Sequence, residues 1–65
     1  MTLGEQVRAR RRELGLRQDE VADLAGVSTS FVHFVEHDKP GLRLDKFQEV
    51  LAVVGLDIAL VLRST

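Results

Sequence analysis

Apolar and polar residues follow a helical period over most of this chain. At 100° per residue, apolar side chains gather on one side of four stretches, residues 3–14, 18–25, 29–37 and 44–54. Each stretch is followed by residues that commonly end helices, namely Gly15, Gly26, Pro40 with Gly41, and Gly55. The pattern therefore predicts four helices within residues 1–55, and these form one domain.

The last residues of the chain change to a period of two. Leu56, Ile58, Leu60 and Leu62 alternate with Asp57, Ala59, Val61 and Arg63, a pattern typical of a strand. A lone apolar strand leaves its backbone groups unpaired, so we expect it to pair antiparallel with a second copy about a twofold axis near residues 59–60. Residues 56–65 would then be the dimerisation strand, formed by Leu56, Ile58, Ala59, Leu60, Val61 and Leu62. The alternative is that this tail continues the fourth helix.

A tight turn joins the second and third predicted helices. Gly26 suits the left-handed conformation that ends a helix, and Ser28 can cap the helix that follows. A helix, a glycine turn and a Ser-capped helix within about twenty residues are typical of a helix-turn-helix. The leading hypothesis is a DNA-binding regulator.

The first helix carries a cation close to its apolar stripe. Leu3, Val7 and Leu14 lie within about 40° of one another on the helix, and Arg11 lies next to them. A guanidinium in that place needs a buried carboxylate as its partner. Glu36, near Val32 on the third helix, is the candidate, and we predict an Arg11–Glu36 ion pair between the two helices.

The third helix divides into two faces. Val32 and Val35 define its core face, with Phe31 and Glu36 at the borders of that face. The hydroxyl and imidazole groups on the other face can form hydrogen bonds with base edges, and Phe34 lies there as a large apolar ring. Phe34 has two interpretations of equal weight, packing on a neighbouring loop or contact with a thymine methyl group. The predicted base-reading residues are Thr29, Ser30, His33 and Phe34.

Contacts with DNA phosphate are expected beside this face. Arg17 occupies the capping position of the second helix, where a cation is unfavourable, so it either reaches a phosphate or is a tolerated surface residue. Lys39 and Arg43 precede the fourth helix and could also touch phosphate, as could Lys46. The net charge of −1 is weak evidence against nucleic acid, but five of the nine basic residues lie within the first seventeen positions.

A competing motif overlaps the third helix. Residues 33–37, HFVEH, match the H-x-x-E-H pattern of inverted zinc proteases. A catalytic zinc site needs a third ligand and a cleft, which 65 residues hardly provide, and Glu36 points toward the core. We therefore expect that the protein binds neither a metal nor a cofactor and that it is not an enzyme.

Composition limits the remaining classes. The chain has 45% hydrophobic residues and no Cys, so it is too apolar to be disordered and has no disulfides. A domain this short commonly needs oligomerisation as a support. No apolar run reaches the length of a membrane span, and a charged helix follows Met1 directly, so we expect a cytoplasmic protein.

These residues resemble a known family. The segment LGEQVRARRRELGLRQDEVADLAGVSTSFVHFVEHDKPG, residues 3–41, is similar to the Cro/C1 (XRE) helix-turn-helix of phage repressors. The continuation KPGLRLDKFQEVLAVVGLDIALVL is similar to HipB-like and y4mF-type regulators, which also end in a strand that pairs across a dimer. Arg17 departs from the Ser, Thr or Asn that the family usually has there.

The resemblance implies a mainly α, lambda-repressor-like fold of four helices, with one C-terminal strand pairing across a homodimer. It implies that Gln18 contacts the DNA backbone and that Thr29, Ser30, His33 and Phe34 occupy base-reading positions. It also implies a repressor of its own operon that acts as antitoxin to a HipA-like kinase. The alternatives are a stand-alone repressor, a module that mainly binds a kinase, and an all-helical dimer as in restriction controller proteins.

Overall fold

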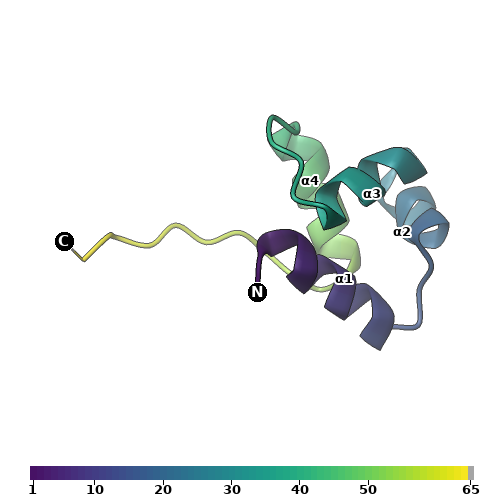
Figure 1. Ribbon diagram of the computed structural model, residues 1–65, viewed down its shortest axis with the longest axis horizontal. Helices are drawn as coiled ribbons and strands as arrows, with labels where there is room; N and C mark the ends of the chain where they lie inside the picture. Colours follow the sequence, from purple (N-terminus) through teal and green to yellow (C-terminus); the bar gives the residue numbers. More distant parts are fainter. Residues whose placement is uncertain (65) are drawn as a thin grey trace.

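The computed structural model describes residues 1–64 and contains four α-helices in this range (Figure 1). They are α1 (Leu3–Glu13), α2 (Gln18–Ala25), α3 (Thr29–Glu36) and α4 (Leu44–Val53). The four predicted helices are confirmed, and α1, α3 and α4 each end one residue earlier than expected. None of the helices in the described part of the chain is long and apolar enough to cross a membrane.

Local side-chain contacts fix where the helices begin and end. Thr2 Oγ1 accepts a hydrogen bond from the Glu5 amide at 3.1 Å, and the Thr2 amide donates to Glu5 Oε1 at 2.8 Å, which is a capping box. Ser28 Oγ accepts from the Phe31 amide at 3.0 Å, as expected for the cap of α3. Gly26 has a φ of 71°, the left-handed conformation that ends α2.

The core consists mainly of valines contributed by all four helices. The side chains that are fully buried are Val7, Val21, Val32, Val50 and Val54. On α4, Val50 and Leu51 are buried, whereas Leu44 is 61% exposed. The buried positions of α4 therefore lie in its C-terminal half, and its first turn is exposed.

The face of α1 that meets the core also differs from the prediction. Leu3 is 64% and Leu14 46% exposed, whereas Gly4 and Val7 are buried. Gly4 has no Cβ, and an added Cβ would lie 2.5 Å from the carbonyl oxygen of Glu36. The close approach of α1 to α3 at this glycine turns the helix so that Gly4 and Val7 face the core and Leu3 lies at its border.

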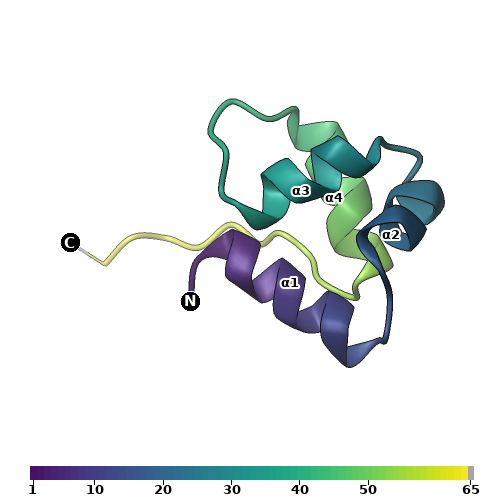
Figure 2. The same ribbon diagram turned by 45° about the vertical axis from the view of Figure 1, so that its right-hand side comes forward.

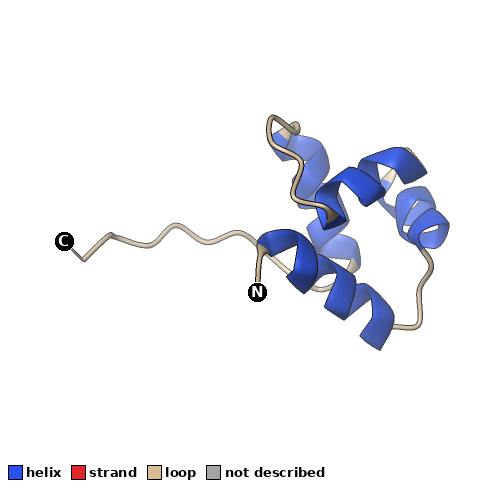
Figure 3. Cartoon of the chain, in the orientation of Figure 1, coloured by secondary structure: helices blue, strands red, loops and turns tan. Residues whose placement is uncertain are grey.

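The predicted C-terminal strand is not formed by the single chain. Residues 1–64 contain no β-strand, and the tail after α4 is an extended segment that leaves the helices beside the start of α1 (Figures 1 and 3). A β-ladder needs a second backbone, and one copy of the chain offers none to this tail. The tail is not a continuation of α4 either, because Gly55 follows the helix with a φ of 77°.

Candidate nucleic-acid interface

The structure places α2 and α3 in contact (Figure 1), joined by the turn through Gly26 and Ser28, which can be followed in Figure 2. The amide of Val27 donates to the carbonyl of Ala22 at 3.0 Å, which closes the last turn of α2 before α3 starts. Val21, Ala22, Val32 and Val35 bury the inner faces of the two helices in the common core. This packing holds α3 in a fixed orientation with its opposite face open to solvent.

An ion pair links α1 to the end of α3. Arg11 Nε donates to Glu36 Oε2 at 2.6 Å and Arg11 Nη2 donates to Glu36 Oε1 at 2.9 Å, so the contact is bidentate. The Glu36 side chain is 1% and the Arg11 side chain 12% exposed. Arg11 Nη1 also donates to the carbonyl oxygen of Leu16 at 3.0 Å. The structure therefore brings together the two residues of the predicted pair, at the junction of three segments.

Gln18 is the third member of this junction. Its Nε2 donates to Glu36 Oε1 at 3.2 Å, and this contact joins the first residue of α2 to the last residue of α3. Burial by itself raises the pKa of Glu36, but hydrogen bonds from Arg11 and Gln18 and the charges of Arg11 and Arg8 outweigh it. The pKa of Glu36 therefore lies below its ordinary value of 4.5, and the carboxylate is ionised at neutral pH.

The outward face of α3 carries the predicted base-reading residues. Thr29, Ser30 and His33 are exposed and lie together on this face. The rings of His33 and His37, one helical turn apart, stack with their centroids 4.0 Å apart. His37 Nδ1 lies 2.8 Å from the carbonyl oxygen of His33, and a carbonyl only accepts, so this nitrogen carries the hydrogen. Hydroxyl and imidazole groups are thus presented to solvent along one helix face.

Phe34 contacts the loop after α3, in agreement with one of its two interpretations, while contact with a thymine methyl group stays a prediction. The Nζ of Lys39 lies 4.1 Å from the centroid of the Phe34 ring, a cation–π contact with the loop after α3. The amide of Lys39 also donates to the carbonyl of Phe34 at 3.0 Å. Phe34 nevertheless remains 37% exposed. The ring packs on the neighbouring loop and is still partly accessible to solvent.

Each of the four predicted phosphate-contacting residues already has a partner within the chain. Arg17 lies 3.2 Å from Asp19 and 3.4 Å from Glu20. Arg43 pairs with Asp45 through two contacts of 2.6 and 3.1 Å. The remaining two are Gln18, bound to Glu36, and Lys39, over the Phe34 ring. The two Arg pairs are exposed, and exposed ion pairs contribute little to stability, so either arginine can exchange its carboxylate for another anion at little cost.

Sequence reasoning did not identify the role of Asp38. This residue has a φ of 56°, in the left-handed region, and its carboxylate accepts from Thr2 Oγ1 at 2.6 Å and from the Gly4 amide at 2.8 Å. These hydrogen bonds lower the pKa of Asp38 below its ordinary value of 3.8. The available signal was an Asp directly before Lys-Pro-Gly, because Asp adopts the left-handed conformation more readily than most residues.

The zinc-protease pattern does not assemble as a site. Glu36 of the HFVEH motif directs its carboxylate to Arg11 and Gln18 rather than to His33 and His37. Within residues 1–64, no three His, Cys, Asp or Glu side chains lie close enough together to hold a metal ion. In this motif, Glu36 therefore anchors the end of α3 to α1 and α2.

Comparison with known proteins agrees with this geometry. Residues 2–63 match the family model described as a helix-turn-helix domain. The chain is 41% identical over 56 residues to the uncharacterized HTH-type transcriptional regulator y4mF of Sinorhizobium fredii (strain NBRC 101917 / NGR234), a match that covers 86% of this chain and 74% of that protein. Since the family match spans nearly the whole chain, the protein belongs to the helix-turn-helix family of XRE-like regulators.

Proposed function

We propose that this protein is a homodimeric, sequence-specific DNA-binding repressor and that α3 enters the major groove. One observation carries the proposal. On α3, Val32, Val35 and Glu36 are buried against the core, while Thr29, Ser30 and His33 are exposed on the other side. A helix held by its inner face and carrying short hydrogen-bonding side chains on its outer face fits direct readout of base edges.

Base reading is assigned to Thr29, Ser30, His33 and Phe34. The two hydroxyl groups and the imidazole can donate to or accept from base edges. The partly exposed Phe34 ring is suited to contact with the C5-methyl group of thymine, and its contact with Lys39 supports the ring. Because the four side chains share one face, they would read adjacent bases of one half-site.

Phosphate contacts are assigned to Arg17, Gln18, Lys39 and Arg43, which flank the reading face at the start of α2 and before α4. Arg17 and Arg43 are exposed and can exchange their carboxylate partners for phosphate oxygens. Gln18 keeps one amide hydrogen beyond the one that it donates to Glu36. Affinity that depends on such contacts falls steeply as the salt concentration rises.

Homodimerisation is assigned to the tail, Leu56, Ile58, Ala59, Leu60, Val61 and Leu62. The alternation of apolar residues and their exposure in the single chain support pairing of this segment with its copy. A twofold axis would set two α3 helices about 34 Å apart, one turn of DNA, over a pseudo-palindromic operator. One short helix reads too few base pairs alone, and a fixed pair supplies the specificity.

Selection of bound sites from a random pool of DNA duplexes tests this proposal. We expect an enriched sequence with two inverted half-sites about 10 base pairs apart, centre to centre. Enrichment of a single half-site would exclude the dimeric arrangement, and a pool without enriched sequence would exclude specific readout. The variant Val32→Asp, which disrupts the core, is the control for recovery that does not depend on the fold.

The finer assignment is autorepression in a HipBA-like operon, with the protein acting as antitoxin to a HipA-like kinase. The similarity of residues 39–62 to HipB-like regulators supports it. A kinase gene next to this one and co-purification of the two products would distinguish an antitoxin from a stand-alone repressor. Inhibition of that kinase by a variant that no longer binds DNA would show that kinase binding is a separate activity.

A further inference from the structure

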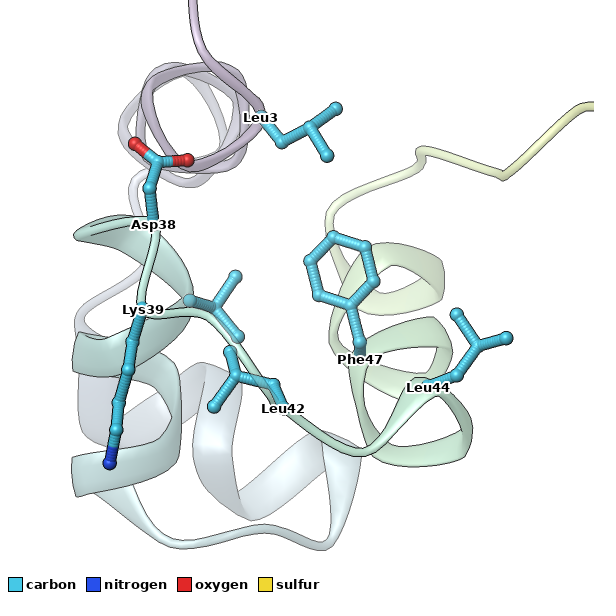
Figure 4. A pocket seen from close by; sticks show the side chains of 7 residues that line it. Leu3, Asp38, Lys39, Leu42, Leu44 and Phe47 are labelled. Carbon is cyan, nitrogen blue, oxygen red and sulfur yellow. The ribbon is translucent and has the colours of Figure 1, made fainter.

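Two apolar hollows meet on the side of the molecule where the tail leaves the helices. One, of about 220 Å³, lies between the start of α1, the loop before α4 and the start of α4. In Figure 4, Leu3 and Phe47 face one another across it. The other, of about 390 Å³, continues along α4 to residues 56–59 of the tail. Leu3, Leu44 and Phe47 line both hollows, so they form one groove, called here the α1–α4 groove.

The tail of the same chain does not fill this groove. Residues 56–59 border it, but the chain then runs away from the helices (Figure 1). Leu60 is 99% and Leu62 96% exposed, and Leu3 and Leu44 on the groove itself are more than half exposed. Exposed apolar surface on both the groove and the tail of one molecule fits association between two copies.

We propose that the second copy occupies the α1–α4 groove, with the twofold axis at Ala59 and the partner's Leu60 and Leu62 lying over the groove. This inference rests on the proposed homodimer and specifies its register. In an antiparallel pair about Ala59, Leu60 lies opposite the partner's Ile58, and Leu62 lies opposite the partner's Leu56. Leu56 and Ile58 border the groove, so the two leucines that face them lie at its opening.

The pleat of the two strands determines whether the twofold axis passes through a residue or between two residues. Side chains that are directly opposite in an antiparallel pair lie on the same face of the sheet. The four even-numbered apolar residues of both copies lie on one face of the two-stranded sheet only when the twofold axis passes through a residue. An axis between two residues would place them on opposite faces in the two copies. An axis at Leu60 would place Leu56 opposite the partner's Ser64, which is polar. The axis at Ala59 matches all four apolar residues with apolar ones.

Charge on the opposite face agrees with this register. Asp57 and Arg63 are both exposed odd-numbered residues, and in the paired strands they would lie on the face opposite to Leu56 and Ile58. With the axis at Ala59, Asp57 is opposite the partner's Val61 and diagonal to the partner's Arg63, within reach of so long a side chain. The two symmetric acid–base contacts would flank Ala59. Like charges do not meet at any position of the pair.

Single cysteines in the full chain test the register, since the natural sequence has none. In mild oxidation, Ala59→Cys should form a disulfide-linked dimer at least about tenfold faster than Leu60→Cys or Val61→Cys. Residues 60 and 61 would lie roughly 7 and 14 Å from their own copies along the strand direction, too far for a disulfide without backbone movement. The readout is the mass under non-reducing conditions, without DNA.

The groove is tested separately with a matched pair of leucines. Leu44→Gln should lower the dimer association constant by about a hundredfold, because the symmetric dimer loses two leucine contacts, each worth about a factor of ten. Leu24→Gln changes a similarly exposed leucine on α2, outside the groove, and should leave association unchanged. Analytical ultracentrifugation over a range of concentrations measures both.

The outcomes separate the inference from the proposed function. Faster cross-linking at residue 59 together with weaker association of Leu44→Gln supports it. Preferential cross-linking at residue 60, or a Leu44→Gln dimer as tight as that of Leu24→Gln, overturns it and leaves the homodimer standing. A wild-type chain that stays monomeric overturns both the inference and the dimeric part of the proposed function.

Discussion

The backbone amide of Gly4 donates a hydrogen bond to Oδ1 of Asp38 at 2.8 Å, although 34 residues separate them. Oδ2 of the same carboxylate accepts from Thr2 Oγ1 at 2.6 Å. Asp38 follows the last residues of α3, and a carboxylate is favourable at the positive end of a helix such as the start of α1. The start of α1 is thus fastened to the end of the helix that we assign to base reading.

Gly4→Ala is expected to destabilise the protein. A Cβ at this position would lie 2.5 Å from the Glu36 carbonyl oxygen and 2.6 Å from that of Val35, so α1 has to move away from α3. Overpacking of this kind costs about 1–3 kcal/mol of unfolding free energy. Urea denaturation followed by circular dichroism measures the change.

Whether Gly4→Ala lowers or raises the free energy of unfolding decides if the close approach of α1 to α3 matters. In an ordinary helix interior, alanine is more stabilising than glycine by roughly 0.5–1 kcal/mol. Ala9→Gly, on the same helix but only half-buried, should show this ordinary penalty for glycine. A Gly4→Ala variant that is more stable than the wild type would mean that the close approach to α3 is unimportant.

Glu36→Ala is expected to cost about 3–5 kcal/mol, the usual loss when one partner of a buried ion pair is removed. Arg11 would keep only its hydrogen bond to the Leu16 carbonyl, and Gln18 would lose its acceptor. The Tm should fall by roughly 4 °C or more for each kcal/mol. Glu49→Ala, at an exposed position of α4, is the control, with an expected change within about 0.5 kcal/mol. Equal Tm values for the two variants would show that the pair contributes nothing.

Stability should fall in acid because of Glu36 and Asp38. Their pKa values in the folded protein lie below the ordinary values of 4.5 and 3.8. A lowered pKa gives stability that is complete above the ordinary value and is lost as the pH falls through the lower, folded value. The Tm should therefore hold down to about pH 5 and decline below it. Glu36→Gln should show a shallower decline, and the same slope as in the wild type would exclude Glu36 as its source.

The helices and the inner face of α3 could be predicted from the sequence, because they depend on local period and caps. Arg11 and Glu36 could be paired in advance because each is a charge on an apolar stripe. Leu3 was misplaced because the exact rotation of a helix depends on its neighbours, here on the contact of Gly4 with α3. The hydrogen bonds of Asp38 were not foreseeable, since they join a loop to a helix start far away in the sequence.

Phe34→Ala and Arg43→Ala should weaken DNA binding in different ways. Loss of the Phe34 ring should relax the preference at one position of each half-site, with discrimination there falling by about 1 kcal/mol or more. Loss of Arg43 should weaken binding to all sequences about equally and make the dependence on salt less steep. Competition binding against single-base variants of the selected site measures both. If Phe34→Ala changes neither affinity nor preference, the ring only packs on Lys39.

Deletion of residues 57–65 should convert the protein to monomers. The truncated chain keeps all four helices and the core residues Val50 and Val54, so the helix content should be retained, while the segment assigned to pairing is gone. Deletion of residues 63–65 alone is the matched control, because it keeps every residue from Leu56 to Leu62. Sedimentation should give a monomer for the first deletion and a dimer for the second.

On DNA, the monomer should bind a single half-site and a full palindrome with nearly equal affinity per site, because two unlinked copies gain no effective concentration from each other. A dimer that survives the longer deletion would move the interface to the helices and remove the tail from the proposed function.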